Sequence, residues 1–347
     1  MRPAHLTAVL DREFSSTKEG HHTPVMIWGP PGVGKSQMVA QVAQKYDVPL
    51  IDLRLSQMEP SDLRGIPFRN EQTVEWAVPA ILPNAKRHGE EGILFIDEIT
   101  SAPPSVSAAA YQLILDRCLG EYAIPDGWAI FAAGNRQGDR GVTYSMPAPL
   151  ANRFSHFEFE VNIDDWVAWA YKNNVDDRVI AFIRFRPELL FDFDPAHNPV
   201  AFPSPRSWEF AHRAIQKFEN NSDLRLGSLQ ACVGPAAGIE LDAFIRNLDQ
   251  LPDINAIVQG EKLPAPKEID LQYAVASSLV GHAIRAVETK NAEEIHGNIL
   301  DYASAFPQKE MGVMLVSDMH RAIGQDIFSI PQFAKWSNDV ADIMLYQ

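Results

Sequence analysis

The sequence contains only two cysteines, Cys118 and Cys232, among 347 residues. They provide neither a disulfide framework nor a closely spaced cysteine pair for a metal. No apolar run approaches the roughly 18 residues that a membrane-spanning helix needs. Residues 1–5 lead into no apolar segment typical of a secretory signal. We therefore expect a cytoplasmic protein with no membrane anchor.

Positive charge is also scarce. The chain has 30 lysine and arginine residues against 45 aspartate and glutamate residues, which gives a formal charge of −15. An acidic chain repels a phosphate backbone, which disfavours broad nucleic-acid binding but leaves a local basic groove open. The length exceeds what one small core needs and predicts two domains.

A glycine-rich segment begins at Gly29 and reads G-P-P-G-V-G-K-S. It lies between the apolar run 24–28 and a helical pattern at about 36–46. Phosphate-binding loops have this pattern, G-x-x-x-x-G-K-[ST], between a strand and a helix. The candidate nucleotide-binding residues are Gly29, Pro30, Pro31, Gly32, Val33, Gly34, Lys35 and Ser36. The segment predicts binding of a nucleoside triphosphate.

The loop residues suit phosphate chemistry individually. Gly32 and Gly34 let the backbone bend so that successive N–H groups point at phosphate oxygens. Lys35 would reach the terminal phosphates as a point charge, and Ser36 would place its hydroxyl on Mg²⁺. The helix that follows would add the positive end of its dipole to the same site.

Apolar strands alternate with helical patterns from about residue 23 to residue 161. This alternation predicts the α/β class, with a parallel sheet covered by helices. The expected strands are 25–28, 50–55, 93–96, 129–133 and 156–161. A polar insertion at about 56–79 is long for a simple connection, so we expect it to have a function of its own.

Strand patterns fade from about residue 164, and apolar residues recur at helical spacing instead. The expected helical segments are 164–185, 206–218, 227–248, 268–287, 292–306, 309–323 and 332–346. We therefore expect a nucleotide-binding core over residues 1–163, followed by a helical region over 164–347.

Two acids, Asp97 and Glu98, directly follow the apolar strand 93–96. Ligands of parallel sheets sit at the carboxyl edge of the strands, which places Asp97 beside the phosphate loop. There it could hold Mg²⁺ together with Ser36. Glu98 could orient and deprotonate the water that attacks the γ-phosphate. This second acid indicates hydrolysis rather than a GTPase switch.

Asn135 ends the next apolar strand, 129–133 with Gly134. If that strand lies between the two motif strands, the amide is level with the γ-phosphate and can hold the attacking water. Arg153 follows a short helical pattern and should face outward, as an arginine finger for a neighbour's γ-phosphate does. Arg140 is the alternative finger.

Arg206 lies near the start of the helical segment that follows Ser204 and Pro205. From the first turn of that helix it could reach over the nucleotide. A lid that moves with the state of the nucleotide needs such a contact.

These motifs, in this order, resemble the AAA+ ATPases, and most closely the MoxR family. The resemblance covers about residues 25–214. It makes residues 29–36 the Walker A motif, 93–98 the Walker B motif and Asn135 sensor 1. Arg153 becomes the arginine finger and Arg206 sensor 2. The chain departs from the family at Arg136, where a proline is usual, and in a shortened hairpin at about 120–128.

The resemblance implies a P-loop core, an α-helical lid, and a ring, usually a hexamer, with ATP and Mg²⁺ at each subunit junction. Family members typically act as chaperone-like motors. They work with a partner that carries a von Willebrand factor A domain and remodel or activate a protein client.

The sequence leaves two alternative functions open. The first is a DNA-linked AAA+ motor or loader, which a basic strip along the insertion or hairpin would favour. The basic residues there, Arg64, Arg69, Lys86, Arg87 and His88, are few. The second is a scaffold that binds ATP without turnover, and Glu98 argues against it.

Overall fold

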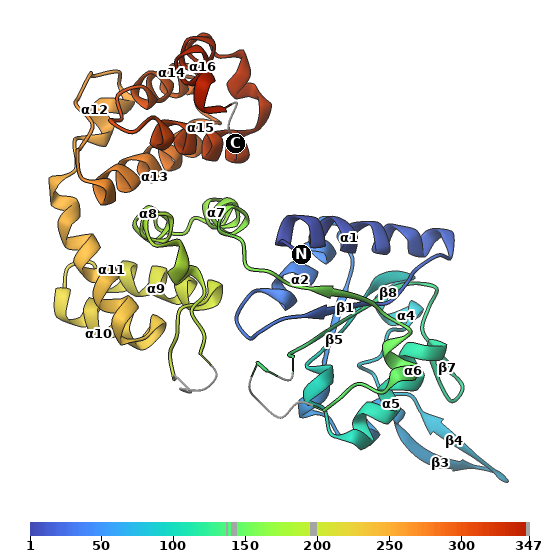
Figure 1. The fold of residues 1–347 in the computed structure, drawn as a ribbon. Coiled ribbons are helices and arrows are strands. Elements are labelled where there is room, and N and C mark those ends of the chain that lie inside the picture. The colour runs from blue at the N-terminus through green and yellow to red at the C-terminus, as the bar shows by residue number, and fades with distance from the viewer. Residues whose placement is uncertain (137, 140–143, 195–199, 345–347) are drawn as a thin grey trace. The chain divides into compact units, whose positions relative to one another are not determined.

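The structure is a computed structural model that describes residues 1–136, 138–139, 144–194 and 200–344, with side chains to residue 340. Figure 1 shows its ribbon. The chain divides into two compact units, Met1–Asn162 and Ile163–Gln347.

The first unit contains a five-stranded parallel sheet in the order β2-β5-β8-β1-β9. Its strands are β1 (Val25–Trp28), β2 (Leu50–Arg54), β5 (Glu91–Asp97), β8 (Gly127–Gly134) and β9 (Ser155–Glu158). The predicted α/β class and parallel sheet are confirmed. The strand that ends before Asn135, β8, lies between β5 and β1, as expected.

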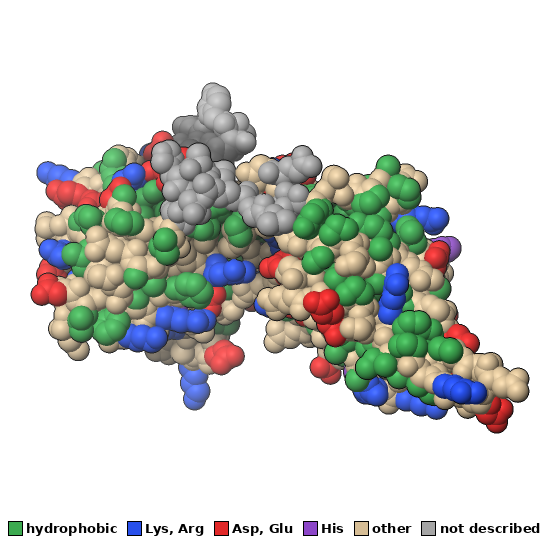
Figure 2. Space-filling view, turned by 90° about the horizontal axis from the view of Figure 1, so that it is seen from below, with side chains coloured by type: hydrophobic (Ala, Val, Ile, Leu, Met, Phe, Trp, Pro, Cys, Tyr) green, Lys and Arg blue, Asp and Glu red, His purple; other side chains and the backbone are tan. Residues whose placement is uncertain are grey.

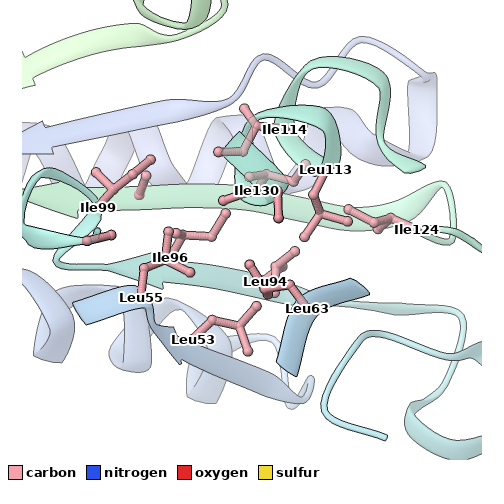
Figure 3. Packing of buried hydrophobic residues seen from close by; sticks show 14 of the residues in the cluster. Leu53, Leu55, Leu63, Leu94, Ile96, Ile99, Leu113, Ile114, Ile124 and Ile130 are labelled. Carbon is pink, nitrogen blue, oxygen red and sulfur yellow. The ribbon is translucent and has the colours of Figure 1, made fainter. Parts of the chain in front are cut away.

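Helices cover both faces of this sheet (Figure 1). One face carries α1 (Pro3–Ser16) and α2 (Lys35–Lys45), which contact each other and β8. On the other face, α3 (Pro60–Arg64) and α5 (Pro104–Asp116) close a buried apolar cluster against β2, β5 and β8 (Figure 3). Successive strand residues point to opposite faces, so strands covered on both sides are apolar throughout.

The two longest helices of the first unit that the sequence does not predict are α1 and α5. The buried apolar residues of α1 are Leu6, Leu10 and Phe14, an i, i+4, i+8 stripe only one residue wide. In α5 several small alanines fill the buried face. Narrow stripes and small residues give a weak periodic signal, so these helices are hard to recognise from the sequence.

The insertion after β2 forms a projecting antiparallel hairpin of β3 (Ile66–Asn70) and β4 (Thr73–Ala77). It was expected to be polar, but Ile66, Val74 and Trp76 are more than half exposed on it. Figure 2 shows hydrophobic surface beside charged side chains on this projection. Gly65 begins the hairpin at φ +83°, where a Cβ atom would lie 2.0 Å from the Ala77 carbonyl oxygen.

Short elements complete the first unit. They are α4 (Ala85–His88), α6 (Ala148–Ala151), a small hairpin of β6 (Cys118–Leu119) and β7 (Tyr122–Ala123), and the 3-10 turns η1 (Thr17–Glu19), η2 (Leu55–Gln57) and η3 (Ile99–Ser101). The small hairpin spans residues 118–123, and four of these residues are paired. It is therefore shorter than the hairpin at 120–128 that the sequence predicts.

The described part of the second unit is helical. Its helices are α7 (Ile163–Lys172), α8 (Asp177–Phe185), α9 (Pro205–Lys217), α10 (Ser222–Val233), α11 (Pro235–Asn247), α12 (Ile254–Val258), α13 (Ile269–Ala286), α14 (Ala292–Ala303), α15 (Lys309–Ile323) and α16 (Pro331–Met344). The 3-10 turns are η4 (Pro187–Leu190), η5 (Leu248–Gln250) and η6 (Gly324–Ser329). In the described residues no helix is long and apolar enough to cross a membrane.

The single helix predicted over 227–248 is wrong. Helix α10 begins earlier, at Ser222, and ends before Gly234, which adopts φ +91°. Pro235 then begins α11. A proline cannot donate the helical hydrogen bond and clashes with the preceding turn, so one continuous helix is excluded at this point.

Candidate functional site

The glycine-rich loop connects the end of β1 to the start of α2. The Gly29 N–H donates to the Gly134 carbonyl at 3.2 Å, which fixes the loop to the neighbouring strand β8. Gly32 and Gly34 adopt φ +81° and +106°, a region that favours glycine. No side chain caps the start of α2. The first N–H groups of a helix have no intrahelical acceptor, and they suit an anion here.

Lys35 is 8% exposed and turns back over the loop. Its Nζ donates to the carbonyl oxygens of Gly29 at 2.6 Å and Pro30 at 2.9 Å, and to Oδ1 of Asn135 at 3.3 Å. The structure thus brings together Lys35 and the side-chain amide of Asn135, two predicted site residues that lie 100 positions apart in the sequence.

Ser36 and Asp97 also meet. The Ser36 hydroxyl donates to Oδ2 of Asp97 at 2.8 Å. Both groups offer hard oxygen ligands, which suit Mg²⁺, an ion that usually takes one or two protein ligands beside phosphate and water. Among the described residues no cluster of three or more His, Cys, Asp or Glu side chains could hold a metal. The Ser36 hydroxyl and the Asp97 carboxylate fit the ligands that Mg²⁺ takes beside a phosphate.

Glu98 adopts an uncommon backbone conformation. Its φ and ψ are +55° and +33°, the left-handed region, which costs a residue with a side chain about 1–2 kcal/mol. Its N–H donates to Oδ1 of Asp97 at 2.8 Å, and its carboxylate accepts a hydrogen bond from the Ser56 hydroxyl. The sequence prediction missed Ser56. Ser56 follows β2, which lies beside β5 in the sheet, but no motif in the sequence marks it.

Asn135 is held through its backbone by Thr100, which is 4% exposed. The Asn135 N–H donates to the Thr100 hydroxyl, and that hydroxyl donates to the Asn135 carbonyl, both at 3.2 Å. A Cβ atom on Gly134 would lie 2.8–2.9 Å from Met26 and Thr100, so only glycine fits there. Thr100 was also missed by the sequence prediction, since no motif marks it.

Arg136, the departure from the family pattern, pairs with Glu158 at 2.9 Å. Trp28 is in register with Gly134 on one side and Glu158 on the other. The ion pair therefore spans the carboxyl end of β1, just before the loop.

Asp52 on β2 adds negative charge near the two acids. Burial raises the pKa of its carboxyl group, and the charge of Asp97 raises it further, while Arg54 at 3.4 Å opposes both. A bound cation would relieve this repulsion between carboxylates.

The arginines are less constrained. Arg153 is exposed two residues beyond α6, and among the described residues its side chain has no hydrogen bond or ion pair. Arg140, the alternative finger, lies outside the described residues. Arg206 is an exposed residue in the first turn of α9, in the second unit, and its reach toward the nucleotide stays a prediction.

Comparison with known proteins gives one family match. Residues 24–154 match the AAA domain of the dynein-related subfamily. Midasin from Giardia intestinalis is 26% identical over 162 residues, which are 44% of this chain but only 3% of midasin.

Solved structures show weaker similarity. An ATPase candidate from Cytophaga hutchinsonii is 14% identical with a TM-score of 0.33, covering 96% of this chain and 79% of that one. A RuvB variant from Thermotoga maritima is 16% identical with a TM-score of 0.40, covering 80% and 81%. Superpositions at this level establish no common fold by themselves. The matched sequence and the sheet order agree on a P-loop AAA+ fold for this part of the chain.

Proposed function

We propose that this chain is a ring-forming ATPase of the MoxR type that hydrolyses ATP to remodel a protein client. The observation that carries the proposal is the convergence of Lys35, Ser36, Asp97 and Asn135 at one edge of the sheet through direct hydrogen bonds. Glu98, adjacent to Asp97, supplies the group that separates hydrolysis from binding alone.

Each residue has a distinct task in this proposal. The loop N–H groups and Lys35 bind the β- and γ-phosphates. Ser36 and Asp97 would hold Mg²⁺, which neutralises phosphate charge when bound. Glu98 takes the proton of the attacking water, and Asn135 orients that water. Arg153 reaches the γ-phosphate of the adjacent subunit, so turnover depends on assembly. Arg206 contacts the nucleotide from the lid.

The remaining parts of the proposal depend on the family resemblance. They are a hexameric ring, a partner with a von Willebrand factor A domain, and a cytoplasmic location. The exposed apolar side chains of the β3–β4 hairpin are consistent with protein contacts rather than with a phosphate backbone.

The test is Glu98→Gln, measured by phosphate release and by titration with a fluorescent ATP analogue. We expect turnover to fall by at least about 100-fold, because the amide cannot accept a proton, while ATP affinity stays within about twofold. Glu121→Gln, on the small hairpin, is the matched control and should retain turnover. Unchanged hydrolysis by Glu98→Gln would exclude its role as the base.

A further inference from the structure

The last residue of β1, Trp28, lies directly before the phosphate loop. Its indole N–H donates to Nδ1 of His156 on β9 at 2.9 Å. The other imidazole nitrogen, Nε2, lies 2.8 Å from the carbonyl oxygen of Ala151. Since Nδ1 accepts a hydrogen bond from the Trp28 N–H, the neutral ring carries its proton on Nε2, and this N–H donates a hydrogen bond to the Ala151 carbonyl. The three residues form a continuous chain of hydrogen bonds.

The strand register explains why these side chains meet. Strands β1 and β9 are parallel, and Met26 is opposite His156. Trp28, two residues further along β1, therefore points to the same face as His156. The two rings stack with centroids 5.9 Å apart and an angle of 18° between their planes. Hydrogen bonds at both ring nitrogens restrict the imidazole.

The series of hydrogen bonds that starts at Trp28 ends at the turn that carries Arg153. Ala151 is the last residue of α6, and its carbonyl also accepts the Phe154 N–H at 3.2 Å. Leu150 and Phe154, on either side of Arg153, are 1% and 7% exposed and belong to the apolar cluster. The turn is therefore anchored by two buried side chains, and the imidazole fixes its backbone between them.

We propose that Trp28 and His156 are positioning residues that couple the phosphate loop of one subunit to the Arg153 that the same subunit presents to its neighbour. This inference deepens the proposed function and rests on its assignment of Arg153 as the finger. Gly29, the first residue of the loop, is bonded covalently to Trp28. Any backbone adjustment of the loop on binding phosphates is transmitted through the indole and the imidazole to the Arg153 turn.

The coupling makes a specific kinetic prediction. Trp28→Phe keeps an aromatic ring but removes the N–H donor, and His156→Ala removes the middle of the chain. We expect Trp28→Phe to lower kcat in the assembled ring about tenfold, the size expected for one lost hydrogen bond. His156→Ala removes two hydrogen bonds and should lower kcat at least as much. ATP affinity should stay within about twofold, because the hydrogen bonds of both side chains run to β9 and α6 rather than to the loop. His156→Gln, whose amide can both accept and donate, should recover part of the loss.

A double variant separates this role from a general effect on folding. In Arg153→Ala the finger is absent, so adding Trp28→Phe should cause no further loss of kcat. His21→Ala, which replaces a histidine at an exposed position outside the proposed site, is a control that should leave kcat unchanged. Thermal unfolding and ring size are measured for each variant. If His156→Ala fails to fold, Trp28→Phe and His156→Gln carry the test.

The outcomes distinguish the inference from the proposed function. If Arg153→Ala retains full turnover, the finger assignment fails and the proposed function with it. If Arg153→Ala loses turnover while Trp28→Phe and His156→Ala keep theirs, only the coupling is overturned. The coupling is also overturned if Trp28→Phe lowers kcat further in the Arg153→Ala background, because Trp28 would then act through a group other than Arg153.

Discussion

At the scale of single residues, Thr100 shows how the structure positions a candidate catalytic amide without touching a substrate. Its hydroxyl satisfies both the N–H and the carbonyl of Asn135. Thr100→Val preserves the shape and removes both bonds. A buried N–H left without an acceptor costs about 1–3 kcal/mol, and a displaced Asn135 should also lower turnover. Urea unfolding and phosphate release measure the two effects.

Thr100→Ser is the matched control for this prediction. It retains the hydroxyl and removes only a methyl group, so turnover should remain close to that of the unaltered chain. If Thr100→Val keeps both its stability and its turnover, the hydroxyl has no part in holding Asn135.

His22 makes stability depend on pH. Burial, with a further contribution from the charge of Arg117, lowers the pKa of its imidazole to about 4, although its bonds to Glu13 and Ile130 oppose the shift. The folded pKa lies below the unfolded value of 6.5. The contribution to stability is therefore complete above about pH 6.5 and is lost as the pH falls toward 4.

We expect His22 to account for a loss of about 2 kcal/mol of unfolding free energy between pH 7 and pH 5. His22→Gln keeps an acceptor for the Ile130 N–H and cannot titrate, so it should remove this part of the pH dependence. Urea unfolding of both chains at the two pH values gives the difference directly. If the free energy of unfolding changed by the same amount between the two pH values in both proteins, His22 would not be the source of the pH dependence.

The adjacency of Lys35, Ser36, Asp97 and Asn135 could be predicted because each ends or follows a strand at the same sheet edge. Ser56, Thr100 and His22 could not. Serine, threonine and histidine occur widely on surfaces, and nothing local in the sequence indicates which backbone group they will meet. Their partners, Glu98, Asn135 and Ile130, lie 35 to 108 positions away in the chain.

At the scale of elements, α7, α8 and α15 of the second unit are joined by a buried ion cluster. Arg184 on α8 donates to Asp318 on α15 at 3.1 Å and to Asp164 on α7 at 2.7 Å. Burial alone would raise the pKa of Asp164, but its bonds to Arg184 and Arg321 lower it below its usual value. Burial of Asp318 has the larger effect and raises the pKa of that carboxyl group despite both arginines.

Arg184→Met should therefore destabilise the second unit strongly, by about 3–5 kcal/mol, because it leaves the buried carboxylate of Asp318 without its main partner. The double variant Arg184→Met with Asp318→Leu removes the uncompensated charge and should recover much of this loss. The urea midpoint followed by helical circular dichroism measures both. Arg213→Ala, which breaks an exposed pair with Glu209, is the control and should change stability by less than about 1 kcal/mol.

The elements also show which patterns the sequence expresses clearly. Central strands are apolar throughout, so β1, β5 and β8 were predicted close to their observed bounds. The boundary between α10 and α11 depends on Gly234, which has a positive φ, and on Pro235. A periodic apolar pattern does not indicate such a boundary. The β3–β4 hairpin was missed because its strands are exposed, and exposed strands lack the alternation that burial on one face imposes.

At the scale of the whole molecule, the proposed function requires that another copy supply Arg153 to complete the candidate site. The sequence could predict that this arginine is exposed, but not which surface it reaches, because the second copy is outside the chain. Mixing two inactive variants tests the assignment. Lys35→Ala removes the loop cation and keeps the finger, whereas Arg153→Ala keeps the loop and removes the finger. Each alone should hydrolyse ATP at a small fraction of the normal rate.

Rings assembled from equal amounts of the two variants should recover activity. A site is intact where an Arg153→Ala subunit, with its working loop, adjoins the finger of a Lys35→Ala subunit. Random assembly gives this arrangement at about one half times one half, or about a quarter, of the junctions. Phosphate release should therefore return to about a quarter of the normal rate per subunit, with ring size checked by light scattering. If Arg153 acted within its own subunit, no mixture could regain activity, since every subunit would carry one defect.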